Sequence, residues 1–270
     1  MPVTDVRGVD DPRLAPYRDV PDAELMHARG LFVAEGRLVV RRVIEDGRFR
    51  VRSVLVNEAA ARDLAPVLDA LPPATPIFLC QTADFAVTGH DLHRGCLALV
   101  ERPPATPISS VLASPTTLVV LEGVTDPDNV GSVFRNAAAL GAGGVLLSPT
   151  CCDPFYRKAV RTSMGAVLRV PFARAAEWPA ALMDVRAAGF TLVALTPRQP
   201  SETLERYAAG PRSSRLALIV GTEGEGLTPA VESAADRRVS IPMQGNVDSV
   251  NLAVAVGIAL FTLRARDNGS

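Results

Sequence analysis

Short apolar runs recur through the second half of this chain and constrain its fold more than any other feature. Helical patterns occupy the stretches between them. The runs lie at residues 118–121, 144–147, 191–195, 216–220 and 239–241. Strands that are apolar along their whole length are buried on both faces, and their alternation with helices is typical of a parallel sheet. We therefore predict an α/β domain over residues 117–270, ending in an Ala/Val/Leu-rich helix at about 250–264.

The first part of the chain predicts a smaller α/β domain over residues 21–102, because helical and strand patterns alternate there as well. Helices are expected at 22–29, 38–44, 58–71 and near 82–87, and strands at 31–34, 49–56, 77–80 and 95–100. Residues 1–20 contain prolines among charges and are expected to form an extended, loosely held leader. Residues 103–116 hold four prolines with Ser and Thr, which indicates an interdomain linker.

Composition indicates a soluble globular protein, with 48% hydrophobic and 21% charged residues. No apolar run reaches the length of about 18 residues that a membrane helix needs, and no secretory signal is evident, so we expect a cytoplasmic protein. The four cysteines and three histidines lack the spacing of a metal or redox site. We therefore expect free thiols, at least partly buried, and no metal.

Positive charge comes almost entirely from arginine, with Lys158 as the single lysine, although the net charge is only −1. The planar guanidinium of arginine is better suited than the lysine ammonium to bidentate hydrogen bonds with phosphate and to stacking on bases. A GC-rich coding bias or a solvated helix face would explain the same pattern. Six arginines fall within sixteen residues: Arg37, Arg41, Arg42, Arg48, Arg50 and Arg52.

The first of three unusual segments is Asn129-Val-Gly-Ser-Val-Phe-Arg135, which follows the strand at 118–121 and begins a helix. Asn129 or Asp128 would serve well as the helix N-cap. Arg135 is flanked by Val133, Phe134 and a run of alanines, on a helix whose other faces look buried. A guanidinium in such surroundings must be paired or must point at a ligand.

The second segment is Gly221-Thr-Glu-Gly-Glu-Gly-Leu227, directly after the strand at 216–220. Its glycines permit close backbone approach to a ligand. Glu223 and Glu225 would repel a pyrophosphate, which argues against an NAD or ATP site and favours a small ligand with positive charge. We interpret Glu225 as a solvated turn residue.

The third segment is Ile241-Pro-Met-Gln-Gly-Asn-Val-Asp-Ser-Val-Asn251, a strand end and polar loop that lead into the last helix. Ser249 is a reasonable N-cap for this helix. Asn251, just inside an otherwise apolar helix, has less structural reason to be polar. Met243 offers a flexible, polarisable wall for a planar ring.

In this order, the three segments resemble the three motifs of the SpoU (TrmH-type) RNA ribose methyltransferases, over roughly residues 116–265. The resemblance implies a parallel sheet with a deep trefoil knot, which binds S-adenosylmethionine and forms a homodimer. It implies that Asn129 and Arg135 meet the target nucleotide, that Glu223 is the acid of the second motif, and that Ser249 and Asn251 are the polar pair of the third. Positions matching cofactor contacts are Gly221, Ile241 and Val250, with Met243 beside them. Two residues depart from the usual pattern: Val250 stands in place of leucine and Asn136 in place of threonine or similar.

Residues 22–101 resemble the ribosomal-protein-like (L30e-like) domain that often precedes this methyltransferase half. The matching segments are Phe32-Val-Ala-Glu-Gly36 and His93-Arg-Gly-Cys-Leu-Ala-Leu-Val100. In such a domain, phosphate contacts would come from the arginine cluster, and we assign them to Arg37, Arg41, Arg42 and Arg50.

The implied function is transfer of a methyl group from S-adenosylmethionine to a ribose 2′-hydroxyl of RNA, a reaction that needs no metal. Ribosomal RNA is favoured over transfer RNA, because an RNA-binding domain helps to locate one nucleotide on a large target. A non-catalytic RNA-binding protein with the same fold is one alternative. A nucleotide-binding α/β enzyme is another alternative. Such an enzyme should have a Lys-Ser/Thr pair or a G-x-G-x-x-G turn directly after a strand, and neither follows a strand here.

Overall fold

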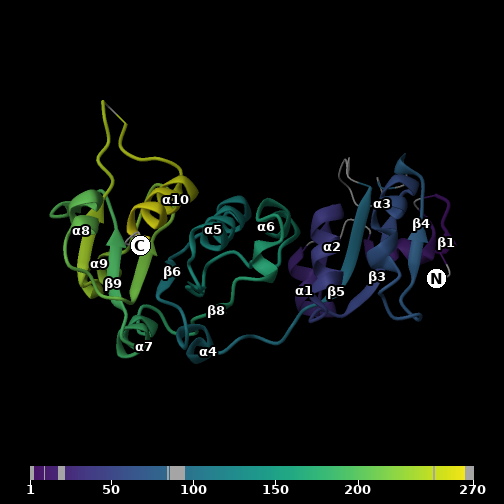
Figure 1. Ribbon diagram of the computed structural model, residues 1–270, viewed down its shortest axis with the longest axis horizontal. Coiled ribbons are helices and arrows are strands. Elements are labelled where there is room, and N and C mark those ends of the chain that lie inside the picture. Colours follow the sequence, from purple (N-terminus) through teal and green to yellow (C-terminus); the bar gives the residue numbers. More distant parts are fainter. Residues whose placement is uncertain are drawn as a thin grey trace, which may run out of the picture. The chain divides into compact units, whose positions relative to one another are not determined.

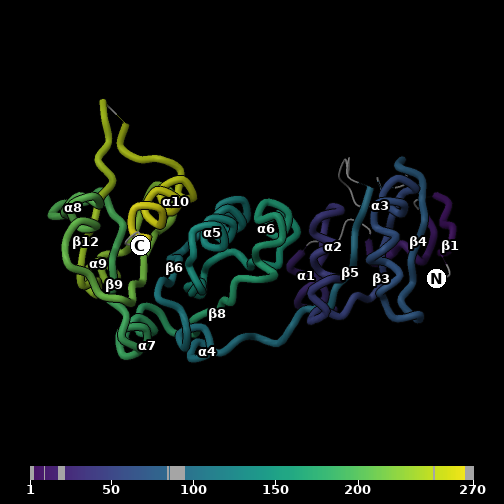
Figure 2. Tube along the Cα trace, in the orientation of Figure 1, coloured from purple at the N-terminus to yellow at the C-terminus, as the bar shows by residue number. Residues whose placement is uncertain are grey.

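The chain divides into two compact units in a computed structural model, which describes residues 3–8, 10–17, 22–83, 85, 95–245 and 247–264 (Figures 1 and 2). Unit 1 comprises Met1–Pro104 together with Pro154–Leu168, and unit 2 comprises Ala105–Asp153 and Arg169–Ser270. Each unit has its own sheet.

Unit 1 is built on a five-stranded mixed sheet with the order β1-β4-β3-β5-β2. β1 and β3 run parallel to β4, whereas β5 is antiparallel to both β3 and β2. The strands are β1 (Val3–Asp5), β2 (Leu31–Glu35), β3 (Val51–Val56), β4 (Ile77–Leu79) and β5 (Cys96–Glu101). The helices before residue 104 are a 3₁₀ helix (Pro12–Tyr17), α1 (Asp22–Arg29), α2 (Arg37–Asp46) and α3 (Glu58–Leu68). Of the predicted helix near 82–87, residues 82, 83 and 85 are described and have 3₁₀ geometry, and the other positions lie outside the described residues.

The prediction of a loosely held leader is wrong for the described part of residues 1–20. Val3 pairs with Ile77 in the sheet. Leu14 and Tyr17 are buried, because residues three apart lie on one face of a 3₁₀ helix. The Tyr17 hydroxyl also lies 2.6 Å from Ser53 Oγ. This stretch therefore belongs to the core of unit 1.

Residues 154–168 pack within unit 1, although the chain on both sides of them belongs to unit 2. They contain α6 (Arg157–Thr162), which contacts β2, and a 3₁₀ helix (Ala166–Leu168). Phe155 stacks on Phe32 with 4.7 Å between ring centroids. Arg157 and Arg161 form ion pairs with the buried carboxylate of Glu35. No sequence pattern predicted this excursion.

Unit 2 contains a seven-stranded sheet, entirely parallel, with the order β10-β12-β9-β11-β6-β7-β8. The strands are β6 (Thr117–Leu121), β7 (Gly144–Leu147), β8 (Phe172–Arg174), β9 (Thr191–Leu195), β10 (Glu202–Thr203), β11 (Leu216–Val220) and β12 (Arg237–Ser240). Leu118 and Val120 join a core cluster on one face of the sheet, and Val119 between them is also fully buried. Burial on both faces and the parallel α/β fold are thus confirmed. The short edge strands β8 and β10 were not predicted.

The helices of unit 2 are α4 (Ile108–Leu112), α5 (Pro127–Leu140), α7 (Ala181–Ala187), α8 (Leu204–Ala209), α9 (Pro229–Ala234) and α10 (Leu252–Leu263). α4 lies inside the predicted linker, but Val111 and Leu112 are buried in the core of unit 2, so this part of the prediction is wrong. Of the helices in the described ranges, none is long and apolar enough to cross a membrane. All four cysteines are free and buried, as expected, and burial raises the pKa of the Cys96 thiol to about 12.

Candidate cofactor cavity and active site

A cavity of about 590 Å³ lies where β9, β11 and β12 of unit 2 end. Its lining comes from the segments that continue from these strands, at 195–197, 220–226 and 241–255. Ligands of parallel α/β sheets usually bind at the carboxyl ends of the strands, and cavities of this volume hold small molecules. The site is therefore built by the chain segments that the apolar strands position.

All four residues predicted to contact a cofactor line this cavity: Gly221, Ile241, Met243 and Val250. Gly221 cannot be replaced without moving the backbone, because a Cβ there would lie 2.2 Å from the carbonyl carbon and oxygen of Gly226. Gly226 has φ +73°, and its N–H donates to Thr222 O at 3.0 Å. The glycines thus close a narrow loop that forms one wall of the cavity.

Three predicted catalytic residues, one from each segment, meet beside the cavity. Asn251 Nδ2 donates to Asn129 Oδ1 at 2.9 Å and to Glu223 Oε1 at 2.8 Å. The N–H of Leu252 donates to the same Glu223 oxygen at 3.3 Å. Asn251 Oδ1 accepts from the N–H groups of residues 253 and 254, so both ends of this amide are oriented. The fold therefore brings together side chains that lie up to 122 positions apart.

The predicted helix caps are wrong at both helices of the site. Asp126 caps α5 by accepting from the N–H of Asp128, because Pro127 fits the first helical position. Asn129 consequently lies inside α5 and is buried. Asn251, not Ser249, caps α10 and therefore has a structural reason to be polar. Ser249 lies in the preceding loop, exposed and lining the cavity.

The other faces of α5 are buried, as predicted, whereas Arg135 itself is exposed. Its neighbours Val133 and Phe134 point into the core, and the guanidinium does not. Among the described residues, no hydrogen bond or ion pair engages it. The structure leaves Arg135 available to a ligand outside the cluster of Asn129, Glu223 and Asn251.

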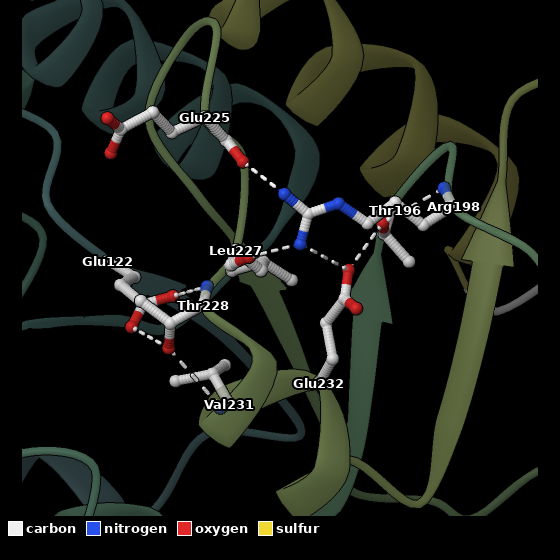
Figure 3. Close-up of polar contacts among 8 residues, drawn as sticks. All are labelled: Glu122, Thr196, Arg198, Glu225, Leu227, Thr228, Val231 and Glu232. Atoms are coloured by element: carbon white, nitrogen blue, oxygen red, sulfur yellow. Dashed lines mark hydrogen bonds and ion pairs between the residues drawn. The ribbon is translucent and has the colours of Figure 1, made fainter.

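A buried carboxylate that sequence reasoning missed lies at the end of β6. Glu122 Oε1 accepts from Trp178 Nε1 and from Thr228 Oγ1, both at 2.8 Å. Its Oε2 accepts from the N–H of Thr228 at 2.9 Å, and Figure 3 shows the two contacts with Thr228. The signal was present, because a glutamate directly after an apolar strand must be satisfied by specific donors.

Most of the arginine cluster of unit 1 is engaged by internal partners. Arg41 donates to Asp63 O at 3.0 Å, and Arg42 donates to Met164 O. Arg50 pairs with Glu101 at 3.6 Å. Arg37 is half-buried, with no hydrogen bond or ion pair to any described residue. Assignment of Arg37, Arg41, Arg42 and Arg50 to RNA stays a prediction.

Within the described residues, no three or more His, Cys, Asp or Glu side chains lie together in a way that could hold a metal ion.

Residues 116–261 match the model of the SpoU rRNA Methylase family. A relative from Mycobacterium bovis, named an uncharacterized tRNA/rRNA methyltransferase, is 41% identical and covers 97% of this chain and 91% of its own. The AdoMet-bound rRNA methyltransferase of Sinorhizobium meliloti has a TM-score of 0.80, 26% identity and 97% coverage of both chains. An RNA 2′-O ribose methyltransferase of known structure has a TM-score of 0.79 and 25% identity, covering 96% of this chain and 98% of its own.

The fold and the site define a parallel α/β protein with a ligand cavity and a polar cluster at its strand ends. This chain belongs to the SpoU family and is an RNA methyltransferase.

Proposed function

We propose that this protein transfers a methyl group to a ribose 2′-hydroxyl of ribosomal RNA. The observation that carries the proposal is the cluster of Asn129, Glu223 and Asn251 beside the cavity, with Arg135 free on the same helix as Asn129. The 2′-hydroxyl is supported by the similarity to the RNA 2′-O ribose methyltransferase, and ribosomal RNA by the Sinorhizobium relative.

S-adenosylmethionine, the predicted cofactor, is confirmed by family membership and by the AdoMet-bound relative. The cavity fits this molecule in chemistry as well as in size. Leu195, Ile241 and Met243 supply apolar walls, and Glu223 and Asp248 supply negative charge for a ligand with an amino group and a sulfonium. When bound, the cofactor supplies a methyl group already activated by its positively charged sulfur.

The residues of the chain orient the ribose and manage its proton. Asn251 holds the Oδ1 of Asn129, which leaves the Asn129 Nδ2 to donate toward the target nucleotide. A guanidinium is a poor proton acceptor, so Arg135 does not act as the literal base. It stabilises the negative charge that develops on the 2′-oxygen and holds a phosphate that accepts the proton. Alignment of the hydroxyl with the methyl group is the largest contribution open to such a site.

We propose in addition that unit 2 contains the trefoil knot and forms a homodimer. α10 packs on α5, and Asn136 Nδ2 of α5 donates to Ala253 O at 2.6 Å. Asn136, which departs from the family pattern, therefore helps to join the two helices. Val254, Ile258 and Phe261 lie on one face of α10 and are exposed in the single chain. Such an apolar face supports burial against a second copy. Unit 1 acts as the L30e-like RNA-binding domain, and the activity is cytoplasmic.

The test is to map 2′-O-methyl positions in ribosomal and transfer RNA from cells with and without the gene. We expect one ribosomal position to lose its methyl group in the deletion strain and to regain it on complementation. Loss of a methyl group from a position in transfer RNA instead would show that transfer RNA is the substrate. An unchanged map, together with purified protein that does not bind S-adenosylhomocysteine in calorimetry, would favour a non-catalytic RNA-binding protein.

A further inference from the structure

Arg198, in the segment that follows β9, reaches across to the glycine loop of the cavity (Figure 3). Its Nη1 donates to Leu227 O at 2.8 Å, and its Nη2 donates to Glu225 O at 2.6 Å. Two carbonyls two residues apart are thus bridged by one guanidinium. Only arginine offers two donors in a fixed planar fork, whereas lysine offers a compact point charge.

The guanidinium is itself held in place by a buried acid. Glu232 of α9 lies with Oε1 3.6 Å from Arg198 Nη1 and accepts from Thr196 Oγ1 at 2.7 Å. The N–H of Arg198 donates to the same Thr196 hydroxyl at 3.2 Å. Glu232 and Thr196 are both buried, and Figure 3 shows their contacts with Arg198. The network fixes both the backbone and the side chain of Arg198.

The two limbs of the glycine loop are joined to each other. Residues 221–224 and Gly226 line the cavity, whereas Glu225 and Leu227 present their carbonyls to Arg198. Because the limbs are joined by the Thr222–Gly226 bridge and by the close approach of Gly221 to Gly226, a shift at residues 225–227 displaces the cavity wall. Glu122 holds the end of the return limb through Thr228.

We propose that Arg198 is a positioning residue for the methyl donor. It does not line the cavity, but it holds residues 225–227 and thereby sets the wall formed by residues 221–224 and the carboxylate of Glu223. This inference rests on the proposed use of the cavity for S-adenosylmethionine. Loss of the fork weakens donor binding and leaves Arg135, which has no bond to Glu223, in place on α5.

The experiment compares wild type, Arg198→Ala and Arg198→Lys by calorimetry with S-adenosylhomocysteine and by thermal unfolding. We expect the Kd to rise about tenfold for Arg198→Ala, as for the loss of charge-assisted hydrogen bonds, and less for Arg198→Lys. Arg198→Lys keeps a positive charge beside Glu232, so it remains informative if the alanine variant folds poorly. In turnover assays, KM for S-adenosylmethionine rises, while KM for RNA and kcat at saturating donor stay near wild type.

Arg186→Ala is the matched control. Arg186 also donates to a carbonyl, Ala234 O at 2.6 Å, and pairs with an acid, Asp236, at 2.8 Å. Its side chain is 38% exposed against 48% for Arg198, but it does not line the cavity or touch the glycine loop. We expect Arg186→Ala to lower Tm as Arg198→Ala does, with an unchanged Kd for S-adenosylhomocysteine.

Unchanged affinity in both Arg198 variants would overturn the proposal, and so would an equal loss of affinity in Arg186→Ala, which would show that general destabilisation is the cause. If the wild type itself did not bind S-adenosylhomocysteine, the proposed function would fail as well. Wild-type binding with unaffected Arg198 variants would refute the positioning role alone.

Discussion

The arginine cluster at 37–52 in unit 1 and Arg135 in unit 2 differ in whether their guanidiniums have partners within the protein. The cluster is dense in the sequence, yet five of its six guanidiniums have partners within unit 1. Arg135 stands among apolar residues and alanines, yet its guanidinium is exposed and has no partner among the described residues. Crowding in a sequence therefore does not measure availability to a ligand. What matters is how many internal acceptors the fold brings to each guanidinium.

The largest expected effect follows from replacing the free guanidinium. Arg135→Ala should lower kcat on the true RNA by about 100- to 1000-fold, the loss typical of one donor that stabilises developing negative charge. The affinity for S-adenosylhomocysteine should not change, because Arg135 does not line the cavity. Single-turnover assays with labelled donor and calorimetry measure the two quantities.

Arg206→Ala is a suitable control for this variant, since Arg206 is an exposed arginine of unit 2 whose side chain has no partner among the described residues. It should retain wild-type turnover. Full activity of Arg135→Ala would refute the catalytic assignment, and equal losses in both variants would indicate a general effect of charge.

The next largest effect concerns Glu35, a buried acid that forms ion pairs with two arginines. Glu35 is buried in β2, with Arg161 at 3.3 Å and Arg157 at 3.7 Å. Glu35→Ala leaves two cations without their partner and should destabilise unit 1 by about 3 kcal/mol. Urea unfolding followed by far-UV circular dichroism measures this loss.

The single tryptophan, Trp178, lies in unit 2 and reports on that unit alone. Its fluorescence transition should therefore move much less than the dichroism transition in Glu35→Ala. Glu24→Ala is the exposed counterpart, because Glu24 pairs with Arg29 at 3.9 Å on the surface. Equal stability of Glu35→Ala and Glu24→Ala would show that burial of the Glu35 pair contributes nothing.

A smaller effect separates two adjacent arginines of the cluster. Arg42 donates to the carbonyl of Met164 and so ties residues 154–168 to α2, whereas Arg41 pairs with the exposed Asp63 at 3.8 Å. Arg42→Ala should lower the free energy of unfolding by about 1.5–2 kcal/mol, and Arg41→Ala by less than about 1 kcal/mol. Limited proteolysis should cut residues 154–168 faster only in Arg42→Ala. Equal effects would mean that the Met164 contact is not structural.

Strand and helix patterns predicted the parallel sheet well because every central strand is apolar on both faces. They failed at β8 and β10, which are too short to show a pattern, and at residues 154–168, whose packing partner Glu35 lies far away in the sequence. The site residues on the cavity were predicted through motifs. The Arg198 network was not, because Glu225 and Leu227 present only backbone carbonyls, which leave no trace in residue type.

The smallest effect tests whether the exposed edge of the cluster contacts RNA at all. Arg50 is 71% exposed and pairs with Glu101 at 3.6 Å. Arg52 pairs with the same carboxylate at the shorter distance of 3.1 Å. Arg50→Ala should leave stability within about 0.5 kcal/mol of wild type, since exposed ion pairs contribute little. If Arg50 meets a phosphate, the slope of log K against log salt for RNA binding should fall by about one.

Glu101→Gln provides the opposite perturbation, because it removes the shared acid and releases both Arg50 and Arg52. Affinity for RNA should then rise, with a steeper salt dependence. Filter binding over a series of salt concentrations distinguishes the two variants. A salt slope that neither substitution changes would remove this face of unit 1 from the RNA interface and leave Arg37, which has no internal partner among the described residues, as the remaining candidate of the cluster.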